Sequence, residues 1–484
     1  MKLKEFPNST LIYIQMLWEN KYTQKGIIFS LIVVGVHLLL FPNYIMSVPI
    51  LLIGLVIILF FYLAFKFYSE NWMQIENFSS KLFIHSFVFR SLSIVGMYAL
   101  TYIYQPENLP LEIGASDAWN YHSSGQLVAN TLKNDGDIFR ALTGFWKNET
   151  DYGFSIYVGI IYYFIGPSVL VIKVCNAIIG SFTAVRIYQI GKEVYSEKKA
   201  RLAGILAMIF PTLLWFTAML LKETILIFLL VNIAYYIISL TNKPQKGLIY
   251  AVLILLNLLP LYYFRVFLIP LVVISIAFHA LFYQAKSMQN KLIIRVVSIF
   301  VFLIISLLAN QLGMVDNFIK TADQASSAFS SELAASAMQR GLNYKVALVT
   351  PFLLISAIIT PFPSLIHFDD NQLGIYMHFQ NELVRNFMYF FVFLGVYHII
   401  KNRKRQAAYI LVFCIGYILI LAISGVSFQD RFQVLALPFL ILFIPEGLER
   451  YSLKKSNNLN IYLFFIFIAI LSWNLFKLSL RQLL

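Results

Sequence analysis

Residues 82–104 read LFIHSFVFRSLSIVGMYALTYIY, and residues 114–146, a short link later, read GASDAWNYHSSGQLVANTLKNDGDIFRALTGFW. The first stretch is long and apolar enough to cross the ~30 Å hydrocarbon core of a bilayer as a helix. The second is polar and holds Asp117, Tyr121 and His122 within two helical turns. Together the two stretches predict apolar helices that carry a polar segment at the membrane surface.

The composition extends this pattern to the whole chain. Of the 484 residues, 60% are hydrophobic and 12% are charged, whereas soluble proteins average about 25% charged residues. Open strands cannot satisfy their edges in lipid, and the alternating pattern of a barrel is not seen in the sequence. We expect an all-α, polytopic transmembrane protein with about 12–14 apolar segments and external juxtamembrane helices. The expected spans are residues 27–41, 47–65, 82–104, 169–190, 202–221, 224–240, 248–263, 266–283, 292–308, 386–400, 407–423, 432–444 and 461–476.

The charges and cysteines exclude several classes of protein. The net charge of +14 comes largely from Lys and Arg in short loops, where they mark cytoplasmic ends and meet anionic lipid. Nucleic acid is therefore not an expected partner. Cys175 and Cys414 lie inside apolar runs, which favours neither a disulfide framework nor a metal site. The first ten residues lack the cleavage pattern of a signal peptide, so we expect the first apolar run to remain as an anchor.

Loop charges also orient the spans. The lysines of residues 1–26 and the basic cluster at 401–405 predict cytoplasmic ends, which places residues 114–146 outside. A full span at 152–165 would put the four cations of residues 192–201 outside as well, so we interpret it as an interfacial or re-entrant helix. This scheme divides the chain into N-terminal spans (1–104), a first external loop with the catalytic candidate (105–168), central spans (169–310), a second external loop with a broken, proline-containing segment (311–385) and C-terminal spans (386–484).

Several ionisable residues fall at the external ends of spans. Each would cost ~2.5–3.5 kcal/mol at mid-membrane, so such residues are functional candidates. Any one of them could instead extend to water beside its own helix, but their number on one face favours a shared site. They are Asp117, Lys222, Glu223, Arg265, Arg385, Asp430 and Arg431.

These residue types suit a sugar carried on a lipid phosphate. Arginine holds a phosphate with two parallel N–H donors, and a nearby carboxylate can act as general base toward an acceptor. Asp117 as the base, with Arg and Lys on the departing phosphate, predicts an inverting displacement. Tyr121 lies one helical turn after Asp117, on the same face, and is either part of the site or an interfacial anchor. His122 is a weaker candidate, since such a histidine is more often structural.

Four stretches together resemble a known family: SDAWNYH (116–122), DYGFSIYVGIIYYFIGPSVLVIKVCNAIIG (151–180), VRIYQIGKEVYSEKKARLAGILAMIFPTLLWFTAMLLKET (185–224) and DRFQVLALPFLILF (430–443). Their order and spacing are similar to those of the GT-C superfamily of membrane glycosyltransferases, in the branch of the protein mannosyltransferases and lipid A aminoarabinose transferases. The resemblance implies that Asp117 is the catalytic base, that Glu223 is a second acidic group near the donor, and that Arg431 meets the lipid phosphate.

The sequence therefore predicts a glycosyltransferase that uses a polyprenyl-phosphate sugar and modifies a glycan, lipid or protein on the external face of a bacterial cytoplasmic membrane. Tyr121, His122, Lys222, Arg265 and Arg431 are its candidate substrate-binding residues. No cofactor is assigned, and a need for a divalent metal is left open.

Two alternatives remain. One is a polysaccharide repeat-unit polymerase, for which Arg340, His367, His378 and Arg385 are candidate external residues. The other is a flippase for lipid-linked oligosaccharides or another transporter, which would line a mid-membrane cavity with its cations.

The topology predicts that a cysteine placed at Ser123 reacts with a membrane-impermeant maleimide added to intact cells, because residues 114–146 lie outside. A cysteine at Gln406, beside the basic cluster, should react only after permeabilisation. Labelling of Gln406→Cys but not Ser123→Cys in intact cells would invert the whole scheme.

Overall fold

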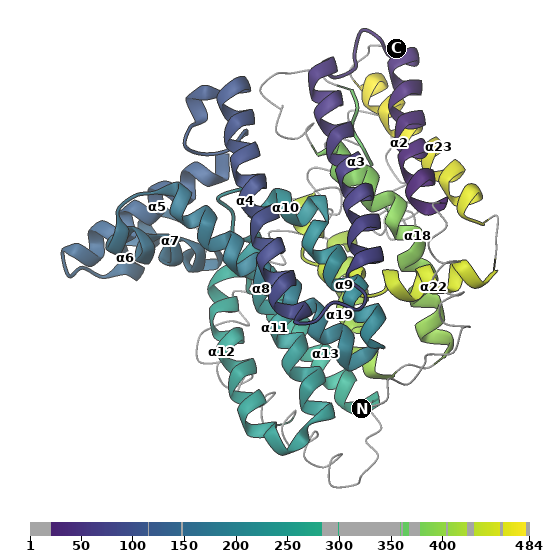
Figure 1. Cartoon of the computed structure of the whole chain (residues 1–484). Coiled ribbons are helices and arrows are strands. Elements are labelled where there is room, and N and C mark those ends of the chain that lie inside the picture. Colours follow the sequence, from purple (N-terminus) through teal and green to yellow (C-terminus); the bar gives the residue numbers. More distant parts are fainter. Residues whose placement is uncertain are drawn as a thin grey trace, which may run out of the picture.

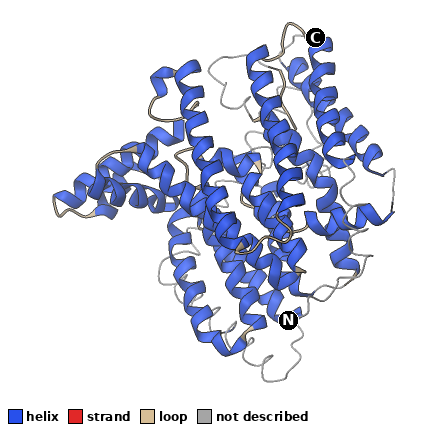
Figure 2. Cartoon of the chain, viewed as in Figure 1, coloured by secondary structure: helices blue, strands red, loops and turns tan. Residues whose placement is uncertain are grey.

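The structure, a computed structural model, describes residues 21–282, 362–366 and 378–480 together with 299 and 359, apart from 115, 147–148, 403–404, 424–429 and 455–457. Within these residues the chain is helical, and the only pairing of extended backbone is one antiparallel bridge between Ile45 and Ile366 (Figure 2). The all-α prediction is confirmed.

Eight helices in the described part are long and apolar enough to cross a membrane, which supports an integral, multi-pass membrane protein. They are α2 (Lys21–Leu40), α3 (Val48–Asn71), α4 (Phe78–Tyr104), α8 (Val169–Val194), α11 (Glu223–Asn242), α12 (Gly247–Arg265), α18 (Phe379–Lys401) and α23 (Asn458–Leu480). Their bounds agree with the predicted spans to within a few residues at most ends. The outer helices leave Leu, Ile, Val and Phe side chains exposed, as a surface facing lipid would.

Helix α11 lies at the centre of the bundle. It is apolar on all sides and buried along nearly its whole length, which is typical of a helix surrounded by others. It packs against α8 and α12 (Figure 1). Because its first residue is Glu223, the best-buried of the eight long helices sets the position of that carboxylate.

The run at 202–221, predicted as one span, is broken. Helix α9 (Glu197–Ile209) and helix α10 (Pro211–Thr217) meet at an angle of 48°. Pro211 has no backbone N–H to pair with the carbonyl of Ala207 and favours the first turn of a new helix. The buried Arg90 of α4 donates from Nη2 to that carbonyl at 3.3 Å. The break leads into a turn at 218–222 that returns the chain to α11.

Three helices form a layer beside the bundle: α5 (Ser116–Lys133), α6 (Ile138–Phe145) and α7 (Tyr152–Ile165). They project to the left in Figure 1. Two glycines let α5 and α7 pack closely. A Cβ on Gly125 or Gly159 would overlap a valine of the facing helix. Helix α7 has 14 residues, too few to span ~30 Å. Its length agrees with the predicted interfacial helix, while the membrane depth of the layer stays a prediction.

The predicted span at 432–444 is wrong. The chain there forms three short helices, α20 (Asp430–Gln433), α21 (Leu437–Ile441) and α22 (Ile444–Lys454). Pro438 and Pro445 each stand at the second residue of a new helix, where a missing N–H is harmless. Helices α13 (Leu268–Phe282) and α19 (Ala408–Ile423) are shorter than the other spans. The segments predicted at 292–308 (apart from residue 299) and 310–343, and most of 346–366, lie outside the described residues.

Two glycines let α18 and α22 cross at backbone distance. A Cβ on Gly447 would overlap the carbonyl oxygen of Phe391, and one on Gly395 would overlap that of Phe443. We expect Gly447→Ala to lower the free energy of unfolding by about 1–3 kcal/mol, because a backbone group cannot move aside like a side chain. Thermal unfolding in detergent measures this. Gly96→Ala, on α4 with open space around it, is the control and should be neutral or stabilising. Equal effects of the two changes would contradict the close crossing.

Candidate functional site

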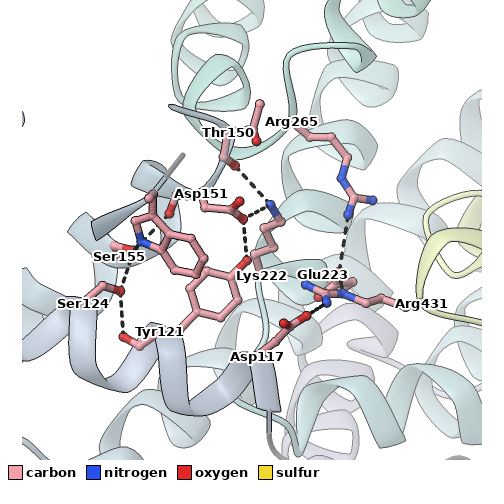
Figure 3. Close-up of polar contacts among 11 residues, drawn as sticks. Asp117, Tyr121, Ser124, Thr150, Asp151, Ser155, Lys222, Glu223, Arg265 and Arg431 are labelled. Atoms are coloured by element: carbon pink, nitrogen blue, oxygen red, sulfur yellow. Dashed lines mark hydrogen bonds and ion pairs between the residues drawn. The ribbon is translucent and has the colours of Figure 1, made fainter. Parts of the chain in front are cut away.

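Four of the predicted residues meet in one cluster. Asp117 lies in the first turn of α5, Glu223 begins α11, Arg265 ends α12, and Arg431 lies on α20. Asp117 and Arg431 are 314 positions apart in the sequence. Figure 3 shows Arg431 between the two carboxylates, with Arg265 reaching the same point from α12. Of the seven ionisable residues expected at the external ends of spans, the structure brings these four into contact. That they form a functional site stays a prediction.

The centre of the cluster is Glu223. Its side chain is 0% exposed, and its Oε1 accepts from Nε of Arg431 at 2.6 Å and lies 3.7 Å from Nη2 of Arg265. A buried carboxylate is tolerated only when it is paired, and the positive end of the α11 dipole adds to that pairing. The guanidinium of Arg265 also stacks over the ring of Phe432, 4.8 Å from its centroid. Glu223 therefore holds the side chain of Arg431, and Arg265 holds that of the neighbouring Phe432.

Arg431 has one buried and one accessible contact. Its Nη1 donates to Oδ2 of Asp117, whose side chain is 48% exposed, while the side chain of Arg431 is 25% exposed. Burial lowers the pKa of Arg431 to about 10, which still leaves it protonated at neutral pH. The guanidinium of Arg431 is therefore accessible to solvent where it contacts Asp117 and buried where it contacts Glu223.

Lys222 points the other way and belongs to a second network. Its Nζ donates to Oδ1 of Asp151 at 2.5 Å and to the carbonyl of Thr150 at 3.0 Å. The hydroxyl of Tyr121 donates to the same Asp151 oxygen at 2.7 Å (Figure 3). Burial, followed by the charge of Arg265, lowers the pKa of Lys222, and burial raises the pKa of Tyr121, which stays a donor. This network ties α5, α7 and α11 together beside the cluster.

His122 does not join either network. Its Nδ1 is 2.8 Å from the hydroxyl of Tyr162, and its Nε2 is 3.0 Å from the amide of Gln126. Burial lowers the pKa of His122 and favours the neutral ring. These contacts lie within the α5–α7 layer and correspond to the structural role that the sequence left as an alternative.

The cations proposed for a polymerase are engaged elsewhere or undescribed. Arg385 of α18 donates to Oδ1 of Asp430, and Nδ1 of His378 lies 3.5 Å from the other carboxylate oxygen. These contacts attach α20 to α18 directly beside Arg431. Arg340 and His367 lie outside the described residues.

Sequence reasoning missed Asp151 and the buried ion pair of Glu112 with Lys173. A signal existed for Lys173, because a lysine within an apolar run is a functional candidate by default. Across the described residues, no group of three His, Cys, Asp or Glu side chains is arranged to hold a metal ion.

Comparison with known proteins adds nothing to the geometry. No protein-family model matches the chain, and no curated protein matches it.

The cluster predicts a coupled loss of stability. Arg431→Met leaves the buried Glu223 with Arg265, at 3.7 Å, as its remaining ion-pair partner, so the free energy of unfolding should fall by ~3 kcal/mol, at the low end for breaking a buried pair. The double variant Glu223→Gln/Arg431→Met should recover at least ~1 kcal/mol of that loss. Unfolding in detergent measures both, and Arg140→Met, on the exposed face of α6, is a control expected within ~0.5 kcal/mol. A double variant no more stable than Arg431→Met would argue against the pairing.

Proposed function

We propose that this protein is a membrane glycosyltransferase that moves a sugar from a polyprenyl-phosphate donor to an external acceptor, with Asp117 as the general base. The observation that carries the proposal is the half-exposed carboxylate of Asp117 on an arginine whose other side is held by the buried Glu223. Asp117 and Arg431 lie beside membrane-spanning helices, where a lipid-linked substrate would arrive. The resemblance to GT-C enzymes supports the same roles for Asp117, Glu223 and Arg431.

The charge balance of the two networks suggests how a phosphate would bind. Three carboxylates (Asp117, Asp151 and Glu223) face three cations (Lys222, Arg265 and Arg431), so the formal charges cancel. A phosphate brings further negative charge that only a released cation can neutralise. Asp117 is the most exposed of the three acids, and exposed ion pairs contribute little to stability. In the proposal the donor phosphate takes the place of Asp117 on Arg431.

This exchange would prepare the chemical step. Asp117, released from Arg431, takes the proton of the acceptor hydroxyl as that oxygen forms a bond to the anomeric carbon. The bond from the anomeric carbon to the phosphate oxygen breaks, and its electron pair stays on the phosphate. Arg431 stabilises the charge that develops there, with two donors aimed at the leaving group. Inversion at the anomeric carbon follows from a single displacement.

The function is tested with purified protein and radiolabelled decaprenyl-phosphate hexoses. We expect Asp117→Asn to bind decaprenyl phosphate at least as well as wild type but to lose transfer ~100–10,000-fold, the usual contribution of a general base. Asp137→Asn is the matched control, because Asp137 only caps α6 by accepting the amides of Phe139 and Arg140, and Asn caps about as well. Transfer by Asp117→Asn within a few-fold of wild type would remove the proposed base.

The same assay separates the binding role and the alternatives. Arg431→Lys should bind decaprenyl phosphate more weakly, because a point charge does not replace the two-pronged guanidinium. Equal affinity would leave Arg431 as a structural group only. Movement of intact donor across liposomes by the wild type, without any release of sugar, would instead identify a flippase.

A further inference from the structure

A buried carboxylate, Glu112, lies outside the cluster around Glu223. It links the segment that precedes Asp117 to the turn that precedes Glu223. Glu112 precedes Asp117 by five positions and is 1% exposed. It stands between Leu111 and Ile113, both also buried. Its Oε1 accepts a hydrogen bond from the backbone N–H of Leu220 at 2.9 Å.

Leu220 belongs to the turn that leads into Glu223. Residues 218–222 lie between the end of α10 and the start of α11, and Leu220 is fully buried there. A turn cannot satisfy its amides as a helix does, and a buried amide without a partner costs about 1–3 kcal/mol. Glu112 supplies the missing acceptor from a segment 108 positions earlier in the chain.

The second carboxylate oxygen of Glu112 has its own cation. Oε2 lies 3.0 Å from Nζ of Lys173 on α8, and the two side chains are 1% and 4% exposed. Removing one member of such a pair leaves an uncompensated buried charge, whereas removing both can be nearly neutral. Glu112 is thus fixed from α8 while it holds the turn before α11.

We propose that Glu112, held by Lys173, is a positioning residue that keeps Glu223, and through it Arg431, in register with Asp117. The inference rests on the proposed function for the meaning of that register. Glu223 holds Arg431, and Arg431 reaches Asp117, so a shift of the 218–222 turn moves the proposed phosphate-binding group relative to the base. A displacement of about 1 Å can cost ~100-fold in rate.

Two double variants separate the hydrogen bond from the charge pair. Glu112→Met/Lys173→Met removes both charges and the acceptor for Leu220. Glu112→Gln/Lys173→Met removes both charges but keeps an amide oxygen for that N–H. Three quantities are compared: hydrogen exchange of the peptide covering 217–223, affinity for decaprenyl phosphate in nanodiscs, and transfer from radiolabelled decaprenyl-phosphate hexose.

We expect the Gln double variant to stay within about threefold of wild type in affinity and transfer. The Met double variant should exchange faster at 217–223 and lose affinity and transfer roughly 10–100-fold. It should also unfold at a lower temperature than the Gln double variant, because the buried N–H of Leu220 loses its acceptor. Equal affinity and transfer in the two doubles would overturn the positioning role. If the Met double variant does not fold, Glu112→Asp decides, because its carboxylate is one methylene too short to serve Lys173 and Leu220 together. Transfer by Glu112→Asp at the wild-type rate would then overturn the role.

The outcomes also distinguish this inference from the function beneath it. If wild type transfers no hexose, the proposed function fails, while exchange and decaprenyl phosphate affinity still compare the two doubles. If Asp117→Asn is inactive and the two doubles are equal, the function stands and only the positioning role is lost.

Discussion

The carboxylate of Glu223 has no exposed surface, and much of the molecule is arranged around the need to neutralise it. A buried charge without a partner would destabilise the fold by several kcal/mol. Two arginines meet that need, one from the end of α12 and one from α20. Two segments, the end of α12 and α20, are therefore fixed at the start of the central helix. Asp117 completes the cluster by taking the free side of one of these arginines.

Consecutive residues at the start of α11 serve different networks. Glu223 faces the arginines, while Lys222 faces Asp151 and the α5–α7 layer. Neighbouring positions at a helix start point about 100° apart, so two adjacent ionisable residues need not pair with each other. The division lets the α5–α7 layer and the C-terminal segment be anchored to the same helix end by different side chains. The two networks still act on each other through charge, because Arg265 contributes to the lowered pKa of Lys222.

The sequence predicted which charged residues would lie at one end of the bundle but not their partners. Span ends follow from hydropathy and loop charge, which brought Asp117, Glu223, Arg265 and Arg431 to a common face. Pairing depends on helix breaks and on side-chain directions that a hydropathy pattern does not contain. Hydropathy predicts continuous spans through Pro211 and Pro438, where the structure has breaks between helices. Nothing in the sequence marks Glu112, because its acceptor role depends on the folded turn at Leu220.

Arg90 and Arg431 differ in exposure, and this difference separates a structural role from the proposed chemical one. Arg90 is buried in α4 and has only neutral partners in these contacts. It donates to the hydroxyl of Ser86 and to the carbonyl of Ala207, which Pro211 cannot pair with. Its role is structural. Arg431 combines a buried contact to Glu223 with an accessible one to Asp117. The buried contact is costly to break and fixes the guanidinium, whereas the accessible contact can exchange for an anion at little cost. In the proposed function, this arrangement lets Arg431 exchange Asp117 for the donor phosphate while Glu223 keeps its guanidinium in place.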